Sequence, residues 1–132
     1  FNANKPKPTG ELTNIYTLVD LCISTKSISS DIVFVKDFDP TIPEILINSN
    51  EFIKLLNKIY TCFSDNKKIY TKIYFRIGEH IKFEDKKYSL FSIEIKAKNK
   101  TKMQEFKAFA ENSNFIIELT DKITINIPMI RA

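Results

Sequence analysis

The chain has 132 residues, of which 43% are apolar and 27% charged, enough for one domain with a single core. Its apolar runs are short, so we predict a soluble protein with neither a membrane span nor a signal-peptide core, and expect no membrane contact. All but two of the 20 cationic residues behind the net charge of +4 are lysines. Because arginine is the residue that reads bases and phosphates through paired hydrogen bonds, this excess argues against nucleic acid as a partner.

Cysteine and glycine usage excludes two further classes of site. Cys22 and Cys62 both stand within apolar patterns, which favours reduced, buried thiols in a cytoplasmic protein over a disulfide or a metal site. The two glycines, Gly10 and Gly78, lie far apart. Since a phosphate cradle needs several glycines close together, nucleotide sites of the Walker and dinucleotide-fold types are excluded.

The N-terminal part predicts a linker, a helix and a strand. Residues 1–10 contain two prolines and a glycine, which indicates a linker, and we expect something to precede it because the chain begins without methionine. From Leu12 to Ile23 apolar residues recur at helical spacing, with Thr13 or Asn14 available as the cap. Residues 31–38, rich in β-branched and aromatic side chains, predict a strand.

The middle of the chain predicts a second, strongly amphipathic helix. Residues 44–47 are expected to form a short strand, after which Asn48 caps the helix and Glu51 completes a capping box. The apolar face of this helix is wide and should lie on a sheet. It consists of Phe52, Ile53, Leu55, Leu56, Ile59, Tyr60 and Phe63.

The C-terminal half predicts most of that sheet. We expect a hairpin around Gly78, Glu79 and His80, and a short third helix over 102–110 with Thr101 and Gln104 as its capping box. The predicted fold is therefore α+β: one domain over residues 11–132, a two-layer α/β sandwich whose mixed sheet of about five strands is covered on one face by two or three helices. The strands expected in this half are 69–77, 88–97, 115–119 and 123–127.

The order of these elements, together with three segments, resembles the GHKL-type catalytic, ATP-binding domain of sensor histidine kinases of the nitrogen-regulation type. The segments are the acidic, proline-marked turn at 37–44, the helix entry at 48–57, which is similar to the start of the N-box helix, and the closing hairpin with its proline at 112–128. The resemblance covers nearly the whole chain. It implies a histidine-kinase ATPase-like fold, a role in two-component signalling and, in active members, binding of magnesium and ATP.

The sequence departs from that family at the positions that would bind nucleotide. Asn57 matches the first N-box asparagine, whereas Thr61 stands where the family has the second, a magnesium ligand. The strand ending near Ile95 is followed by lysines, where the family has an adenine-binding aspartate and glycines. Between Lys98 and Glu111 there is too little chain for a nucleotide lid as well as a helix.

We therefore predict a degenerate domain without catalytic, nucleotide-binding or metal-binding residues and without a cofactor, in which Asn57 and Thr61 are only remnants. It would not be an enzyme by itself, and would act by contact with phosphoacceptor helices or a response regulator; the missing N-terminal region could make it oligomeric. Alternatives are an active kinase domain with a divergent pocket, or an unrelated basic binding module. His80 is interpreted as an exposed loop residue. The candidate docking residues for an acidic partner are Lys96, Lys98, Lys100 and Lys102.

Overall fold

The computed structural model describes residues 5–131, so residues 1–4 of the expected linker lie outside the described part of the chain. Residues 5–131 form three helices and seven strands. In chain order these are β1 (Glu11–Thr13), α1 (Ile15–Ile28), β2 (Val33–Phe38), β3 (Ile45–Ile47), α2 (Ser49–Cys62), β4 (Lys68–Phe83), β5 (Lys86–Lys96), α3 (Met103–Asn112), β6 (Ile116–Leu119) and β7 (Ile123–Pro128).

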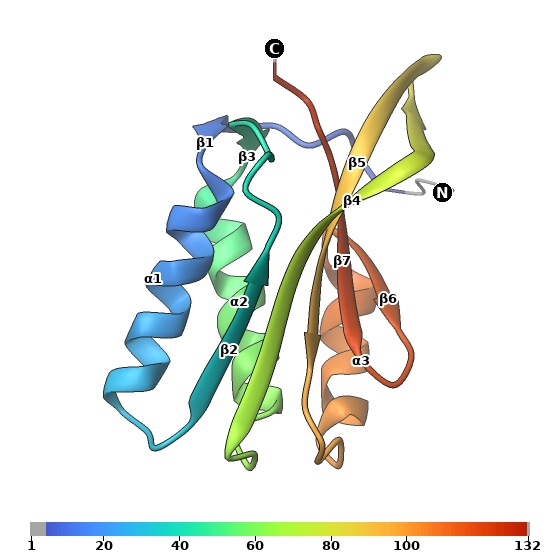
Figure 1. Ribbon diagram of the computed structural model, residues 1–132. Coiled ribbons are helices and arrows are strands. Elements are labelled where there is room, and N and C mark those ends of the chain that lie inside the picture. The colour runs from blue at the N-terminus through green and yellow to red at the C-terminus, as the bar shows by residue number, and fades with distance from the viewer. Residues whose placement is uncertain (1–4, 132) are drawn as a thin grey trace.

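The main sheet has five strands in the order β2-β4-β5-β7-β6, and β1 pairs with β3 in a small second sheet. Only β2 and β4 run parallel; the other neighbours in the main sheet are antiparallel, so this sheet is mixed. Figure 1 views the main sheet from its open face, with α2 and α3 behind it and α1 beside β2. This arrangement confirms the predicted α+β fold with helices on one face of a mixed sheet.

The core lies between the helices and the sheet, because alternate side chains of each central strand point toward α2 and α3. Tyr60 of α2 is also buried there, and its hydroxyl shares a 2.7 Å hydrogen bond with Thr71 of β4. Burying a large apolar side chain contributes about 1.5–3 kcal/mol, so this layer accounts for most of the stability. The buried strand residues include Ile69, Ile73, Phe91, Ile93, Ile95, Ile123, Ile125 and Ile127, and those of α2 include Phe52, Leu55, Leu56 and Ile59.

Helix α1 begins three residues later than predicted. The Asn14 side chain caps it, accepting hydrogen bonds from the backbone N–H groups of Tyr16 and Thr17 at 3.0 and 3.3 Å. Leu12 belongs instead to β1, where it pairs with Leu46 of β3 and is half exposed. Strand pairing of residues 11–13 therefore overrides the helical spacing that begins at Leu12.

The predicted N-cap of α2 is confirmed, whereas the predicted capping box of α3 is wrong. The Asn48 side chain accepts a 3.1 Å hydrogen bond from the backbone N–H of Glu51, as expected of an N-cap. Helix α3 has Lys102 as its N-cap and no side-chain cap hydrogen bond, so the predicted Thr101 and Gln104 capping box does not form. The backbone N–H of Thr101 is taken by Asn99 at 3.0 Å in a turn before the helix.

The predicted hairpin around Gly78 is also wrong. Strand β4 continues to Phe83, and the turn is formed by Glu84 and Asp85, both with positive φ (48° and 67°). Gly78 lies in a bulge between Phe75 and His80, so His80 is an exposed strand residue beyond the bulge and does not lie in the hairpin turn. Ile81 and Phe83 are buried, and their burial keeps the strand paired past the glycine.

The described part of the expected linker, residues 5–10, packs on the domain. The Lys5 ammonium donates to the backbone carbonyls of Glu111, at 3.2 Å, and Ser113. Gly10 has φ +144°, and a Cβ there would lie 2.2 Å from the carbonyl oxygen of Ile47. This approach requires glycine.

No helix within residues 5–131 is both long and apolar enough to cross a membrane.

Candidate functional site

The candidate site is the groove between α2 and α3. In α2, Phe52, Leu55, Leu56 and Ile59 face the core, while Asn57 and Thr61 stand one turn apart toward solvent. Thr61 borders two hollows in the groove; Asn57 lines the outer one. The structure therefore brings Asn57 and Thr61, the two predicted N-box positions, together on the solvent side of α2.

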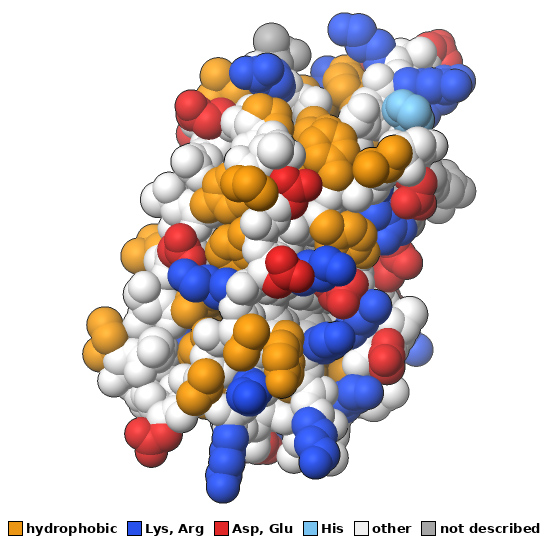
Figure 2. Space-filling model, in the orientation of Figure 1, with side chains coloured by type: hydrophobic (Ala, Val, Ile, Leu, Met, Phe, Trp, Pro, Cys, Tyr) orange, Lys and Arg blue, Asp and Glu red, His pale blue; other side chains and the backbone are white. Residues whose placement is uncertain are grey.

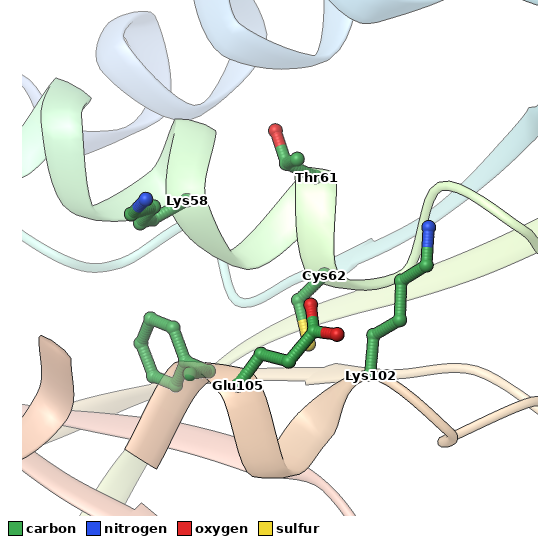
Figure 3. Close-up of a pocket in the computed structure, with 6 residues that line it drawn as sticks. Lys58, Thr61, Cys62, Lys102 and Glu105 are labelled. Carbon is green, nitrogen blue, oxygen red and sulfur yellow. The ribbon is translucent and has the colours of Figure 1, made fainter. Parts of the chain in front are cut away.

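The inner hollow is small, and α3 forms one of its walls. Its volume is about 130 Å³, below the roughly 300–1,000 Å³ usual for small-molecule sites. Lys58, Thr61 and Cys62 of α2 line it together with Lys102 and Glu105 at the start of α3, and Figure 3 shows Cys62 pointing toward Glu105. Phe106, which is 3% exposed, supplies the floor. Helix α3 thus fills much of the space between α2 and the end of the sheet.

Cys62 is a free, half-buried thiol at the centre of this hollow. Burial raises the pKa of the Cys62 thiol, and the nearby Glu105 carboxylate raises it further, more than Lys102 lowers it. In Figure 3 the sulfur of Cys62 and the carboxyl group of Glu105 point into the same space. A thiol held in its protonated form is a poor nucleophile, so Cys62 acts as a packing residue here.

The second remnant position does not suit a magnesium ion. The Thr61 hydroxyl points away from α3, donates a 2.7 Å hydrogen bond to the carbonyl of Asn57 and accepts one from the ammonium of Lys26 at 3.1 Å. The Thr61 hydroxyl is therefore turned out of the groove and engaged by a lysine of α1. Within residues 5–131 no three histidine, cysteine, aspartate or glutamate side chains gather as a metal site.

A buried asparagine that sequence reasoning missed fixes the loop between β5 and α3. Asn66, only 8% exposed, follows α2; its side chain donates to the carbonyl of Asn99 at 2.8 Å and accepts from the Asn99 N–H at 2.7 Å. It also donates to the carbonyl of Phe63 at 3.1 Å. The 98–102 loop is thereby held against the end of α2. Asn66 stands in a polar turn, and nothing in the sequence distinguishes it there from a solvent-exposed residue.

The outer hollow is a shallow furrow along α2, open to solvent, of about 580 Å³. Asn57 lines it together with Lys54, Lys58, Phe109 and other α2 residues. The Lys58 ammonium lies 5.8 Å from the centre of the Phe109 ring. A ligand here would stay largely in water, whereas small-molecule sites usually bury most of their ligand.

The four candidate docking lysines do not form one stripe. Lys96 is the last residue of β5, and Lys98 and Lys100 are exposed in the loop that follows. Lys102 starts α3 and pairs with Asp65 at 3.2 Å. The strand ends at Lys96, before the alternation of lysines could continue.

No protein-family model matches the sequence, and no curated protein matches it. The structure, however, is similar to those of several histidine kinases. It superposes on the Acinetobacter baumannii histidine kinase AdeS with a TM-score of 0.59 and 12% identity, covering 94% of this chain and 69% of that one. For the mycobacterial sensor histidine kinase MprB the TM-score is 0.56 and the identity 9%, with 94% of this chain and 100% of that one covered. For the histidine kinase domain of the E. coli osmosensor EnvZ the TM-score is 0.55 and the identity 9%, with 98% of this chain and 92% of that one covered. This chain therefore has the histidine-kinase ATPase-like fold.

Proposed function

We propose that this domain is a non-catalytic, kinase-like part of a two-component signalling protein, which does not bind ATP and acts by contact with phosphoacceptor helices or a response regulator. One observation carries the proposal: α3 packs against α2 beside the N-box positions, where the resemblance would place a nucleotide. The space left is about 130 Å³ and is lined by two lysines, a protonated thiol and a single carboxylate. A cytoplasmic location, favoured by the two free cysteines, belongs to the same proposal.

The segment after β5 supports this proposal in a second way. Residues 96–102 carry four lysines and no carboxylate that could accept an adenine amine. Asn66 holds the backbone of this segment through Asn99, so the loop is not free to close over a base. A ligand that binds with micromolar affinity needs about 8 kcal/mol of net binding free energy, and a loop without an acidic residue or glycine supports the inference that this groove does not supply it.

Titration with magnesium and ATP tests the proposal. We expect no saturable binding in the micromolar range by calorimetry or by NMR of the labelled domain. The matched variant Thr61→Asn restores the second amide of the N-box pattern without altering α3, and we expect it to remain without binding. Micromolar binding to the unaltered domain, with shifts at Asn57 and Thr61, would contradict the proposal.

The alternative, an active kinase domain with a divergent pocket, draws on the outer furrow. Lys54 and Lys58 line it together with the retained Asn57. This alternative predicts ATP-dependent phosphorylation of a histidine when the domain is part of its full-length protein. Transfer of radioactive phosphate from ATP to the full-length chain, lost on Asn57→Ala, would favour it over the non-catalytic function.

For the contact function itself, Lys96, Lys98 and Lys100 remain the proposed docking residues, because Lys102 is already paired with Asp65. Reversing the two loop charges together, as Lys98→Glu and Lys100→Glu, should weaken binding to a response regulator measured by calorimetry. Unchanged affinity would exclude the loop from the interface.

A further inference from the structure

The open face of the main sheet has an apolar patch at the end near the start of β2. Strand pairing places Val35 beside Tyr70, Tyr70 beside Lys96, and Val33 beside Lys68. Val33 is 55%, Val35 36% and Tyr70 40% exposed. In Figure 2 apolar side chains gather over the lower part of β2 and β4, with basic side chains next to them. We call these five residues the lower sheet face.

The other half of the open face differs because its polar groups satisfy one another. Ser92 donates to Asn126 at 2.5 Å, and Asn126 donates to Glu118 at 2.6 Å. The Arg76 guanidinium reaches Glu118 at 3.6 Å and Glu79 at 2.8 Å. Ser92 and Asn126 are fully buried by this arrangement although no helix covers them. This half therefore leaves few groups for a partner.

The charges around the lower sheet face are unbalanced. Within residues 5–131 neither Lys68 nor Lys96 forms an ion pair, and both are exposed. The Lys68 ammonium rests 5.9 Å from the centre of the Tyr70 ring. The nearby carboxylate of Glu94 is taken by Lys122 at 3.2 Å. The apolar patch is thus flanked by two cations without an ion-pair partner among the described residues, while Asp37, two residues beyond Val35 on the same face of β2, lies beside Lys72.

We propose that the lower sheet face binds an amphipathic helix of a partner protein, with an apolar stripe on Val33, Val35 and Tyr70 and flanking carboxylates on Lys68 and Lys96. Helices pack on sheet faces through such stripes, and the opposite face of this sheet is covered in that way. Complementary charge would steer and orient the partner. This inference rests on the proposed function only in assuming that the domain acts by contact.

A second copy of the chain is a poorer occupant. β2 is the edge strand, and its centre carries Lys36, which pairs with Asp20 of α1 at 3.0 Å. A lysine on an edge strand disfavours addition of another strand. A like-charged second copy would also bring Lys68 and Lys96 toward the same residues of its twin, so the lower sheet face does not complement itself.

A synthetic helical peptide of about five turns tests the proposal, with a leucine stripe and glutamates on both flanks. The comparison peptide has lysines in place of the glutamates. Binding to the isotope-labelled domain is followed by NMR, which reports the affinity and the residues involved. The domain variants are Val35→Asp and the double charge reversal Lys68→Glu with Lys96→Glu. Their matched controls are Leu21→Asp on α1 and Lys107→Glu on α3, both at exposed positions outside the patch.

We expect the acidic peptide to shift the amides of residues 33–35, 68–70 and 96, with about tenfold weaker binding for either patch variant and less than about twofold change for the controls. Raising the salt from about 50 to 300 mM should also weaken binding. The proposal is overturned if the lysine peptide binds as tightly as the acidic peptide, or if the shifts lie in the α2–α3 groove. It is also overturned if single-stranded oligonucleotides or anionic vesicles bind these residues more tightly than the acidic peptide does. ATP binding to α2 would refute the proposed function while leaving this result intact.

Discussion

Replacement of Asn66 by alanine should release the loop between β5 and α3 and destabilise the domain. The side chain makes three hydrogen bonds, to Phe63 and to both backbone groups of Asn99. Alanine would remove all three and leave those backbone groups to find water. Asn57→Ala is the matched control, since Asn57 is a half-buried asparagine at the edge of α2.

The magnitude follows from the number and setting of these bonds. Each hydrogen bond contributes about 0.5–1.5 kcal/mol net, so the loss should total about 2–3 kcal/mol. Because Asn99 is exposed, water can replace the Asn66 side chain as its hydrogen-bond partner. The loss of stability should therefore be smaller than for three buried backbone groups left without a hydrogen bond. For a chain of this size we expect a fall in Tm of roughly 6–10 °C. Asn57→Ala should change stability by less than about 0.5 kcal/mol, because alanine is the better helix former.

Urea unfolding followed by circular dichroism measures the free energies, and amide hydrogen exchange measures the loop. Without urea, the amide hydrogens of Asn99 and Thr101 should exchange faster in Asn66→Ala than in the unaltered domain, and at an unchanged rate in Asn57→Ala. If Asn66→Ala is as stable as Asn57→Ala, or if Asn99 exchanges no faster, then Asn66 does not hold the loop. In that case the 98–102 loop would be free to close over a base.

Three further outcomes are expected from unfolding experiments. Gly10→Ala should cost about 1–3 kcal/mol, since its Cβ would meet the Ile47 carbonyl, and more than Gly78→Ala, where nothing lies within 4 Å. Burial raises the pKa of the Tyr60 phenol, so the folded chain keeps a proton that the unfolded chain releases above about pH 10. The free energy of unfolding should therefore fall as the pH rises above about 10, and it should fall less steeply in Tyr60→Phe. Arg76→Met should cost about 1–3 kcal/mol by leaving the network around Asn126 without its cation, with incomplete recovery in Arg76→Lys.

The fold was predictable because its helices and strands repeat simple patterns. The spacing of Phe52, Leu55, Leu56 and Ile59 defines one buried face of α2, and the alternation in β5 and β7 defines the matching face of the sheet. The errors occurred where two local signals competed. Gly78 suggested a turn, yet burial of Ile81 and Phe83 carries the strand onward to a turn at Glu84 and Asp85.

The candidate site was predictable only in part, because its decisive contacts join segments far apart in the sequence. Asn57 and Thr61 could be placed on one helix face from their spacing. The 3.1 Å hydrogen bond from Lys26 of α1 to Thr61 depends on how α1 packs against α2. The bonds from Asn66 to Asn99 likewise depend on the loop folding back on α2. The lower sheet face was missed because Val33 and Val35 look like any buried strand until the helices are seen to lie on the other side.

The packing of α3 also sets an energetic threshold for any nucleotide. Opening the groove would re-expose Met103 and Phe106, whose burial contributes about 3–6 kcal/mol together. An apparent micromolar affinity corresponds to about 8 kcal/mol, so the intrinsic contacts would have to supply about 11–14 kcal/mol, equivalent to a Kd of roughly 10 nM or tighter. Phe106→Ala would lower this threshold without adding any ligand for the base, phosphates or metal. If ATP bound that variant in the micromolar range but did not bind the unaltered domain, α3 alone would prevent binding; if ATP bound neither, the donor groups of the groove would be a cause as well.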